Sequence, residues 1–135
     1  MRKRILILCT GNSARSQMAE GLLRSMAGER FEVFSAGTKP AGLHPNAVAA
    51  MAEAGIDISG QRSKSVEEFA GQPFDYIITV CDNAKEACPF FPGAGERIHH
   101  GFEDPAAAVE KQPEAFRRVR RALEDWLGEF IAEHS

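Results

Sequence analysis

Residues 5–16 of the chain read Ile5-Leu6-Ile7-Leu8-Cys9-Thr10-Gly11-Asn12-Ser13-Ala14-Arg15-Ser16. The continuously apolar run Ile5–Leu8 predicts a strand buried on both faces, and the spacing of the apolar residues after it predicts a helix over Gln17–Met26. A loop between such elements directs its backbone N–H groups toward one point, beside the positive end of the helix dipole. The stretch therefore predicts a site for a tetrahedral oxyanion, formed by Thr10, Gly11, Asn12, Ser13, Ala14 and Arg15.

Two side chains give this loop a reactive character. Cys9 ends the strand facing the helix N-terminus, a setting that favours the thiolate at neutral pH. The planar fork of Arg15 fits two oxygens of a phosphate-like group. We expect Ser16 to donate its hydroxyl to the thiolate, Asn12 to fix the loop shape, and Gly11 to leave room for close backbone approach. A cysteine that ends a buried strand is more often a small apolar residue, but the arginine at this spacing favours a nucleophile.

The composition indicates one globular domain over residues 1–135. Hydrophobic residues make up 44% of the chain and charged residues 26%, and the net charge of −3 favours neither nucleic acid nor an anionic membrane as a partner. The basic start Met1–Arg4 precedes too short an apolar run for a signal peptide or membrane span, so we expect a cytoplasmic protein. A basic run is expected to be the solvated face of a helix: Arg117, Arg118, Arg120 and Arg121.

The chain has three cysteines, an odd number that argues against a structural disulfide framework and for thiols used as thiols. A zinc site is the alternative, with Cys81, Cys88, His99 and His100 as ligands. Six residues separate the two cysteines, more than the spacing usual for zinc ligands, so we expect no bound metal.

Further strands are predicted at Phe31–Ser35, Asp75–Cys81 and Arg97–His100. Helices are predicted from Pro45 to a cap at Gly55, around Val66–Ala70 with a capping box from Ser65 to Glu68, and over Pro113–Glu133. Asp82–Ala87 can form one helical turn, and Cys88–Gly95 is predicted to be an irregular, mobile loop. The alternation of strands and helices predicts an α/β doubly wound fold, with Cys9 and Cys81 facing one crevice at the sheet edge.

Several motifs along nearly the whole chain match one family. They are Cys9–Glu20, Ser35–Gly37, Gly55–Ser59, Val80–Cys81 with Cys88–Pro89, and Gly101–Pro105, which contains Asp104-Pro105. With them the chain resembles the low-molecular-weight protein tyrosine phosphatases and, within that fold, the thioredoxin-coupled arsenate reductases. The resemblance implies a four-stranded parallel sheet of order 2-1-3-4 with helices on both faces.

The resemblance also implies a reaction. Cys9 is the nucleophile toward arsenate, for which phosphate is a weak mimic, and Asp104 is the acid for the departing oxygen, although an Asp-Pro pair is otherwise an ordinary turn. Cys81 and then Cys88 form successive disulfides that thioredoxin, an external reductant, removes. We expect a monomer without a tightly bound cofactor. Glutaredoxin with glutathione, or mycothiol, remains open as the reductant.

Two other functions are alternatives. A phosphatase of this fold usually carries a second cysteine in the loop and an aromatic residue after Asp-Pro, where this chain has Ala14 and Ala106. A flavodoxin-like nucleotide or response-regulator module needs a hydroxyl-rich loop or an acidic phospho-acceptor pocket in place of Cys9 and Arg15. We rank the reductase first, the phosphatase second and the binding module third.

One position departs from the resemblance. Some arsenate reductases of this group hold a monovalent cation with residues that match Asn12, Glu20 and Ser35 together with an acidic side chain. The acidic position falls on Lys64, whose ammonium can either replace the ion or lie solvated at the surface.

Overall fold

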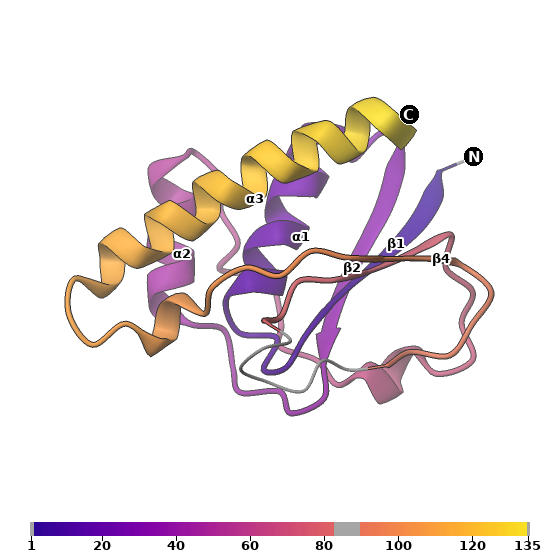
Figure 1. The fold of residues 1–135 in the computed structure, drawn as a ribbon, viewed down its shortest axis with the longest axis horizontal. Coiled ribbons are helices and arrows are strands. Elements are labelled where there is room, and N and C mark those ends of the chain that lie inside the picture. Colours follow the sequence, from indigo (N-terminus) through magenta and orange to yellow (C-terminus); the bar gives the residue numbers. More distant parts are fainter. Residues whose placement is uncertain (1, 83–89, 135) are drawn as a thin grey trace.

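The computed structural model describes residues 2–82 and 90–134 (Figure 1). Cys88 and most of the predicted turn Asp82–Ala87 lie outside the described residues. In chain order the elements are β1 (Lys3–Cys9), α1 (Arg15–Ala27), β2 (Phe31–Gly37), α2 (Pro45–Glu53), the 3-10 turn η1 (Val66–Phe69), β3 (Tyr76–Thr79), β4 (Glu96–His99), the 3-10 turn η2 (Pro105–Ala107) and α3 (Gln112–His134).

The four strands form one parallel sheet in the order β2-β1-β3-β4, which confirms the predicted fold class. Leu8 of β1 lies opposite Ala36 of β2 and Thr79 of β3. The strands run in one direction, so their carboxyl ends meet at one edge of the sheet. Cys9 and Cys81 are therefore brought to the same edge from neighbouring strands.

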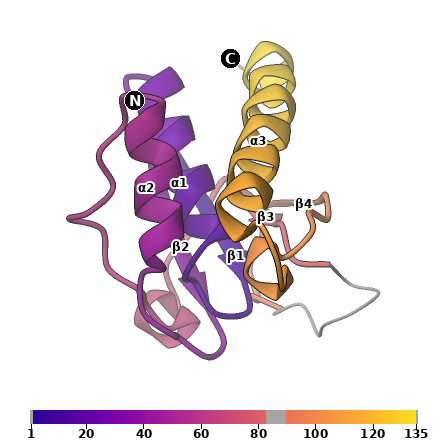
Figure 2. The same cartoon turned by 90° about the vertical axis from the view of Figure 1, so that its left-hand side faces the viewer.

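The helical cover of the sheet is uneven. Helices α1, α2 and α3 pack over the face to which Ile5 and Ile7 point, as Figure 2 shows. Leu6 and Leu8 point to the other face, where the described cover consists of η1 and coil segments that contribute aromatic side chains. Both faces of β1 are consequently buried, as its uninterrupted apolar sequence predicts.

Several boundaries differ from the predicted ones for local reasons. β2 continues two residues beyond Ser35 because Gly37 still pairs with Cys9 and its N–H donates to the Lys64 carbonyl. The helix predicted near Val66 is a 3-10 turn, capped by the Ser65 hydroxyl, which accepts from the N–H of Glu67. The predicted capping box is formed in part: the Glu68 carboxylate accepts from the backbone N–H of Ser65, but the Ser65 hydroxyl accepts from Glu67 and not from Glu68.

The basic run on α3 is only partly solvated. Arg117 and Arg118 make exposed ion pairs, whereas the Arg120 side chain is 11% exposed and donates to the Ala50 carbonyl of α2. The prediction of a fully solvated basic face is wrong at Arg120, because α2 packs against that part of α3. Among the described helices, none combines the length and the apolar character needed to span a membrane.

Candidate active site

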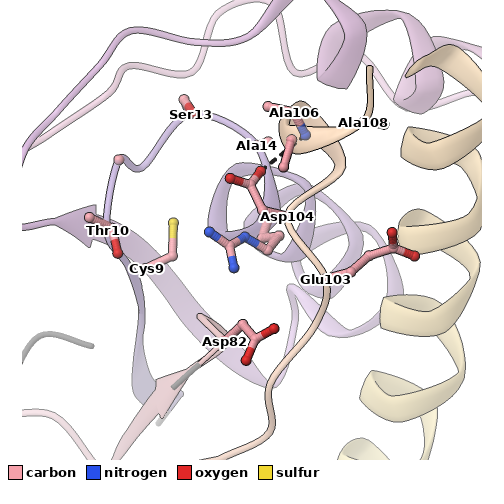
Figure 3. Close-up of a pocket in the computed structure, with 12 residues that line it drawn as sticks. Cys9, Thr10, Ser13, Ala14, Asp82, Glu103, Asp104, Ala106 and Ala108 are labelled. Atoms are coloured by element: carbon pink, nitrogen blue, oxygen red, sulfur yellow. Dashed lines mark hydrogen bonds between the residues drawn. The ribbon is translucent and has the colours of Figure 1, made fainter. Parts of the chain in front are cut away.

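A cavity of about 620 Å³ opens at the carboxyl edge of the sheet. Figure 3 shows the sulfur of Cys9 pointing into it and the carboxylates of Asp82 and Asp104 on the side opposite the loop after β1. The lining residues are Cys9, Thr10, Gly11, Ser13, Ala14, Arg15, Asp82, Glu103, Asp104, Ala106, Ala107 and Ala108. The structure thus brings the predicted nucleophile, arginine and acid to one cavity.

The loop after β1 is held by its carbonyl groups. The Thr10 carbonyl accepts from the N–H of Lys39, and the Gly11 carbonyl accepts from the N–H of Ala41. The Asn12 carbonyl accepts from the Gln17 side chain, and the carbonyl of Ser13 accepts from a backbone N–H. With these carbonyls bonded to the surrounding chain, the loop is compatible with an anion-binding nest, in which successive backbone N–H groups face the anion.

The close backbone approach expected at Gly11 occurs instead at Gly37. A Cβ on Gly37 would lie 2.5 Å from the Thr10 carbonyl oxygen and 2.9 Å from the Asn12 nitrogen, whereas a Cβ on Gly11 would meet only ordinary contacts at 3.5 Å and beyond. The end of β2 is therefore packed directly against the oxyanion loop, and only glycine fits there. In the sequence, Gly37 is the last residue of the Ser-Ala-Gly motif Ser35–Gly37.

Buried polar side chains are hydrogen-bonded to Cys9 and to one another. The Ser16 hydroxyl oxygen lies 2.9 Å from the Cys9 sulfur. The Asn12 amide nitrogen donates to Ser16 at 2.8 Å and to Ser35 at 3.0 Å. Asn12 is fully buried at φ +46°, a left-handed conformation that asparagine tolerates better than most residues. Its predicted role in fixing the loop shape agrees with these contacts.

Arg15 begins α1 and is 5% exposed. Its Nη1 donates to the Phe102 carbonyl at 3.2 Å, so this side chain links the oxyanion loop to the segment that carries Asp104. The N-cap residue of α1 is Ala14, which has no polar side chain, and the first turn of α1 contains no acidic residue. The helix N-terminus is therefore suited to a bound anion.

Asp104 lies on a loop held mainly by side chains. Its own Oδ1 accepts from the N–H of Ala106 at 3.0 Å, while Glu103 forms a bidentate ion pair with Arg118 of α3. Gln112, the first residue of α3, donates to the carbonyls of Ala106 and Ala108. The sequence indicates neither Gln112 nor this role of Arg118, which was expected only on a solvated helix face, because neither residue lies near Asp104 in a recognisable motif.

The cysteines occupy different states. Cys9 is a free thiol, whereas Cys81 is fully buried and disulfide-bonded. Cys81 is not among the lining residues, but the next residue, Asp82, is, and no sequence pattern marks Asp82 as a site residue. The predicted role of Cys88 falls outside the described residues. Within the described ranges, no group of three His, Cys, Asp or Glu side chains could hold a metal ion.

Lys64 is not a surface residue. Its side chain is 11% exposed, and its Nζ lies 3.8 Å from Glu20 Oε1 and donates to the Arg62 carbonyl at 2.6 Å. Burial lowers the pKa of the Lys64 ammonium, and the neighbouring Glu20 carboxylate opposes this shift. The alternative of a solvated Lys64 at the surface is therefore wrong. The ammonium lies beside Glu20, one of the residues that the resemblance implied as ligands of a monovalent cation.

Comparisons with known proteins agree with this geometry. A protein named arsenate reductase from Halalkalibacterium halodurans is 48% identical over 122 residues, which cover 88% of each chain. A solved structure described as an arsenate reductase in reduced state superposes with a TM-score of 0.82 at 34% identity, covering 98% of this chain and 99% of the other.

A third relative is the thioredoxin-dependent arsenate reductase of Corynebacterium glutamicum. It has a TM-score of 0.69 at 27% identity and covers 98% of this chain and 64% of the other. The family model described as low molecular weight phosphotyrosine protein phosphatase matches residues 4–134. With its parallel sheet of order β2-β1-β3-β4 and its cysteine-to-arginine oxyanion loop, the chain belongs to the low molecular weight phosphotyrosine protein phosphatase family.

Proposed function

We propose that this protein reduces arsenate to arsenite through successive thiol steps that start at Cys9. The observation that carries the proposal is the presence of two cysteines at one sheet edge beside an oxyanion loop, with Cys9 at the end of β1 and Cys81 after β3. The names of the similar proteins support the same reaction. A phosphatase needs the first cysteine only.

In the first step the Cys9 thiolate attacks the arsenic atom of arsenate. The loop N–H groups and Arg15 hold the oxyanion, and one oxygen leaves as water after accepting a proton from Asp104. The product is a Cys9–arsenate thioester-like adduct in which arsenic is still pentavalent. The position of Asp104 in the cavity opposite Cys9 supports its role as the proton donor.

In the second step the Cys81 thiolate attacks the Cys9 sulfur. The sulfur–arsenic bond breaks, its electron pair stays on arsenic, and arsenite leaves as trivalent arsenic. Two thiols have supplied the two electrons and become a Cys9–Cys81 disulfide. The adjacency of β1 and β3 supports this exchange, because Leu8 and Thr79 are directly paired and Val80 donates to the Leu8 carbonyl at 3.0 Å.

In the third step the Cys88 thiolate attacks Cys81, which frees Cys9 and leaves a second disulfide for an external dithiol to reduce. A state with Cys9 free and Cys81 oxidised is the one that this exchange produces. Thioredoxin is our proposed reductant, as in the C. glutamicum relative. The sequence-based expectations of a cytoplasmic monomer with no tightly bound cofactor stay predictions.

The cavity wall also bears on the choice between reductase and phosphatase. Beyond Asp104 the wall is formed by the small side chains of Ala106, Ala107 and Ala108. These methyl groups offer no ring face on which a phosphotyrosine could stack. A small free oxyanion is therefore a better match to this cavity than a phosphorylated tyrosine side chain.

The test supplies arsenate with thioredoxin, thioredoxin reductase and NADPH. We expect sustained turnover by the unaltered protein, one arsenite per enzyme from Cys88→Ala, which should stop as a Cys9–Cys81 disulfide, and none from Cys9→Ser. Sustained thioredoxin-linked turnover by Cys88→Ala would contradict the relay. Hydrolysis of p-nitrophenyl phosphate is measured in parallel, and hydrolysis much faster than arsenate reduction would favour the phosphatase.

A further inference from the structure

Among the described residues, three acidic side chains line the cavity, and they differ in how they are held. The Glu103 carboxylate is bonded at both oxygens by Arg118. Asp104 accepts from the N–H of Ala106 and is the proton donor of the proposed reaction. Asp82 is the third of these residues, and the proposed thiol steps give it no task.

Asp82 lies at the part of the cavity where Arg15 is held. A Cβ on Gly101 would lie 3.7 Å from the Asp82 Cα and 3.3 Å from the Cys81 carbonyl oxygen, so the two segments are in contact there. The residue after Gly101 is Phe102, whose carbonyl accepts from Arg15 Nη1 at 3.2 Å. The Asp82 carboxylate is thus in the same cavity as the Cys9 sulfur (Figure 3), near the arginine that holds the oxyanion in the proposed reaction.

The hydrogen-bond donors of this site do not by themselves distinguish one tetrahedral anion from another. Backbone N–H groups and the Arg15 guanidinium donate hydrogen bonds and accept none. Arsenate, phosphate and sulfate all present oxygen acceptors to such donors in a similar tetrahedral arrangement. A site formed by donors alone would therefore bind sulfate as readily as arsenate.

A carboxylate distinguishes these anions through the proton that some of them carry. At neutral pH arsenate and phosphate retain at least one O–H group, whereas sulfate has none. A carboxylate only accepts hydrogen bonds, so Asp82 can accept from the O–H group of arsenate or phosphate. Opposite sulfate the same carboxylate meets only acceptors, and the repulsion between like charges together with the missing hydrogen bond opposes binding.

We propose that Asp82 is a specificity-determining residue: it accepts a hydrogen bond from the protonated oxygen of the bound oxyanion, which admits arsenate and phosphate and disfavours sulfate. The proposal deepens the proposed function, because it concerns which anion enters the site of that reaction. Phosphate carries the same O–H group as arsenate, so Asp82 does not exclude it.

The experiment measures the dissociation constants of inorganic phosphate and sulfate by calorimetry at neutral pH. No thiol is added, so that Cys81 stays disulfide-bonded as in the structure. We expect the unaltered protein to bind phosphate about tenfold or more tightly than sulfate. Asp82→Asn keeps the shape and one acceptor oxygen but can also donate to sulfate. It should bind sulfate roughly tenfold more tightly than the unaltered protein does, with the phosphate constant changed by less than about threefold.

Glu110→Gln is the matched control, because Glu110 is exposed, lies two residues after the lining residue Ala108, and changes the net charge equally when substituted. An equal change of the phosphate-to-sulfate ratio in Glu110→Gln would overturn the proposal. An unchanged ratio in an Asp82→Asn protein that retains its circular dichroism spectrum would also overturn it. If Asp82→Asn does not fold, Asp82→Ala provides the second variant, and an unchanged ratio there has the same consequence.

The outcome for Asp82 is separate from the outcome for the proposed reaction. Neither anion reacts with the protein, so the ratio does not depend on whether the protein reduces arsenate or hydrolyses a phosphate ester. Phosphate binding without discrimination against sulfate would contradict the role of Asp82 alone. No phosphate binding at all would contradict both that role and the oxyanion site on which the proposed function rests.

Discussion

The cavity lies between two loops that are held in different ways. The oxyanion loop, residues 10–14, is fixed by backbone carbonyl bonds and by fully buried side chains such as Asn12. The acid loop, residues 101–108, is fixed chiefly by side chains from α3 that are themselves partly exposed, with Arg118 and Gln112 as the main anchors.

The difference follows from what each loop does in the proposed reaction. An oxyanion site must present several donors in a fixed geometry before the substrate arrives, since stabilisation by preorganised dipoles is lost when they must reorient. A proton donor must reach only one leaving oxygen. The oxyanion loop is accordingly built into the core, and the acid loop is attached to the surface of α3.

The largest effect is expected from the acid itself. Asp104→Asn keeps the shape of the side chain and can still accept from the Ala106 N–H, but it cannot supply the proton. We expect the first-order rate of arsenite release in a single turnover to fall by about 10²-fold or more, with little change in thermal stability. A loss smaller than about threefold would remove Asp104 from the acid role.

The packing of the oxyanion loop is tested by Gly37→Ala. The added methyl would lie 2.5 Å from the Thr10 carbonyl, so the loop or the end of β2 must move. We expect a loss of about 1–3 kcal/mol in the free energy of unfolding together with weaker oxyanion binding. Gly60→Ala is the control, because nothing lies within 4 Å of its Cβ position. Equal effects of both variants on phosphate binding, measured by calorimetry, would contradict the proposed fit.

The sequence predicts the oxyanion loop better than the acid loop for a physical reason. Cys9, Arg15 and Ser16 act within a single strand–loop–helix unit, so their spacing alone indicates a common site. Asp104 was identified only because the resemblance supplied its role. Gln112 could not be found, because its contacts depend on where α3 begins relative to η2, which no local pattern encodes.

The errors elsewhere have the same origin. Arg120 was predicted to be solvated from the charge run around it, yet its environment is set by the carbonyl of Ala50 on another helix. The requirement for glycine at Gly37 arises from a contact with a loop 27 residues earlier in the chain, at Thr10. Patterns within one element predict which face is buried, but they do not predict which neighbour covers it.

Gln112 tests whether the acid loop depends on its side-chain anchors. Gln112→Leu removes the donors to Ala106 and Ala108, and Asn46→Ala removes only the 2.7 Å bond that holds the Gln112 oxygen. We expect Gln112→Leu to lower the rate of arsenite release about five- to tenfold, roughly the free energy of one hydrogen bond. Asn46→Ala should lower it by less.

A double mutant distinguishes positioning of the acid from general destabilisation. When Gln112 acts through Asp104, Gln112→Leu should have almost no further effect on the rate in an Asp104→Asn background, since there is no acid left to position. Full additivity of the two rate effects would show that Gln112 does not act through Asp104.

The buried ion pair of Lys64 and Glu20 next to the oxyanion loop allows a further test. With the Lys64 ammonium beside Glu20, activity of the unaltered protein should differ little between potassium and sodium buffers of equal ionic strength. Lys64→Asp places a carboxylate in this position and should create a preference for potassium, seen in the steady-state rate and in the thermal midpoint. A strong potassium requirement in the unaltered protein would end this interpretation.

The smallest effect is expected when two neighbouring arginines on α3 are substituted and compared. Arg117 and Arg118 both form bidentate ion pairs with a glutamate, but Glu53 belongs to α2 and Glu103 adjoins Asp104. Each pair is exposed, so Arg117→Met and Arg118→Met should lower the thermal midpoint slightly and equally. Arg117 lowers the pKa of Glu53, so the stabilisation by that pair is present at neutral pH and lost as the pH falls through the lowered value.

Only Arg118→Met should reduce the rate of arsenite release, by about twofold, because only its pair restrains the acid loop. Equal rates for the two variants would show that the acid loop keeps its position without Arg118, and that Gln112 with Arg15 is sufficient to hold it.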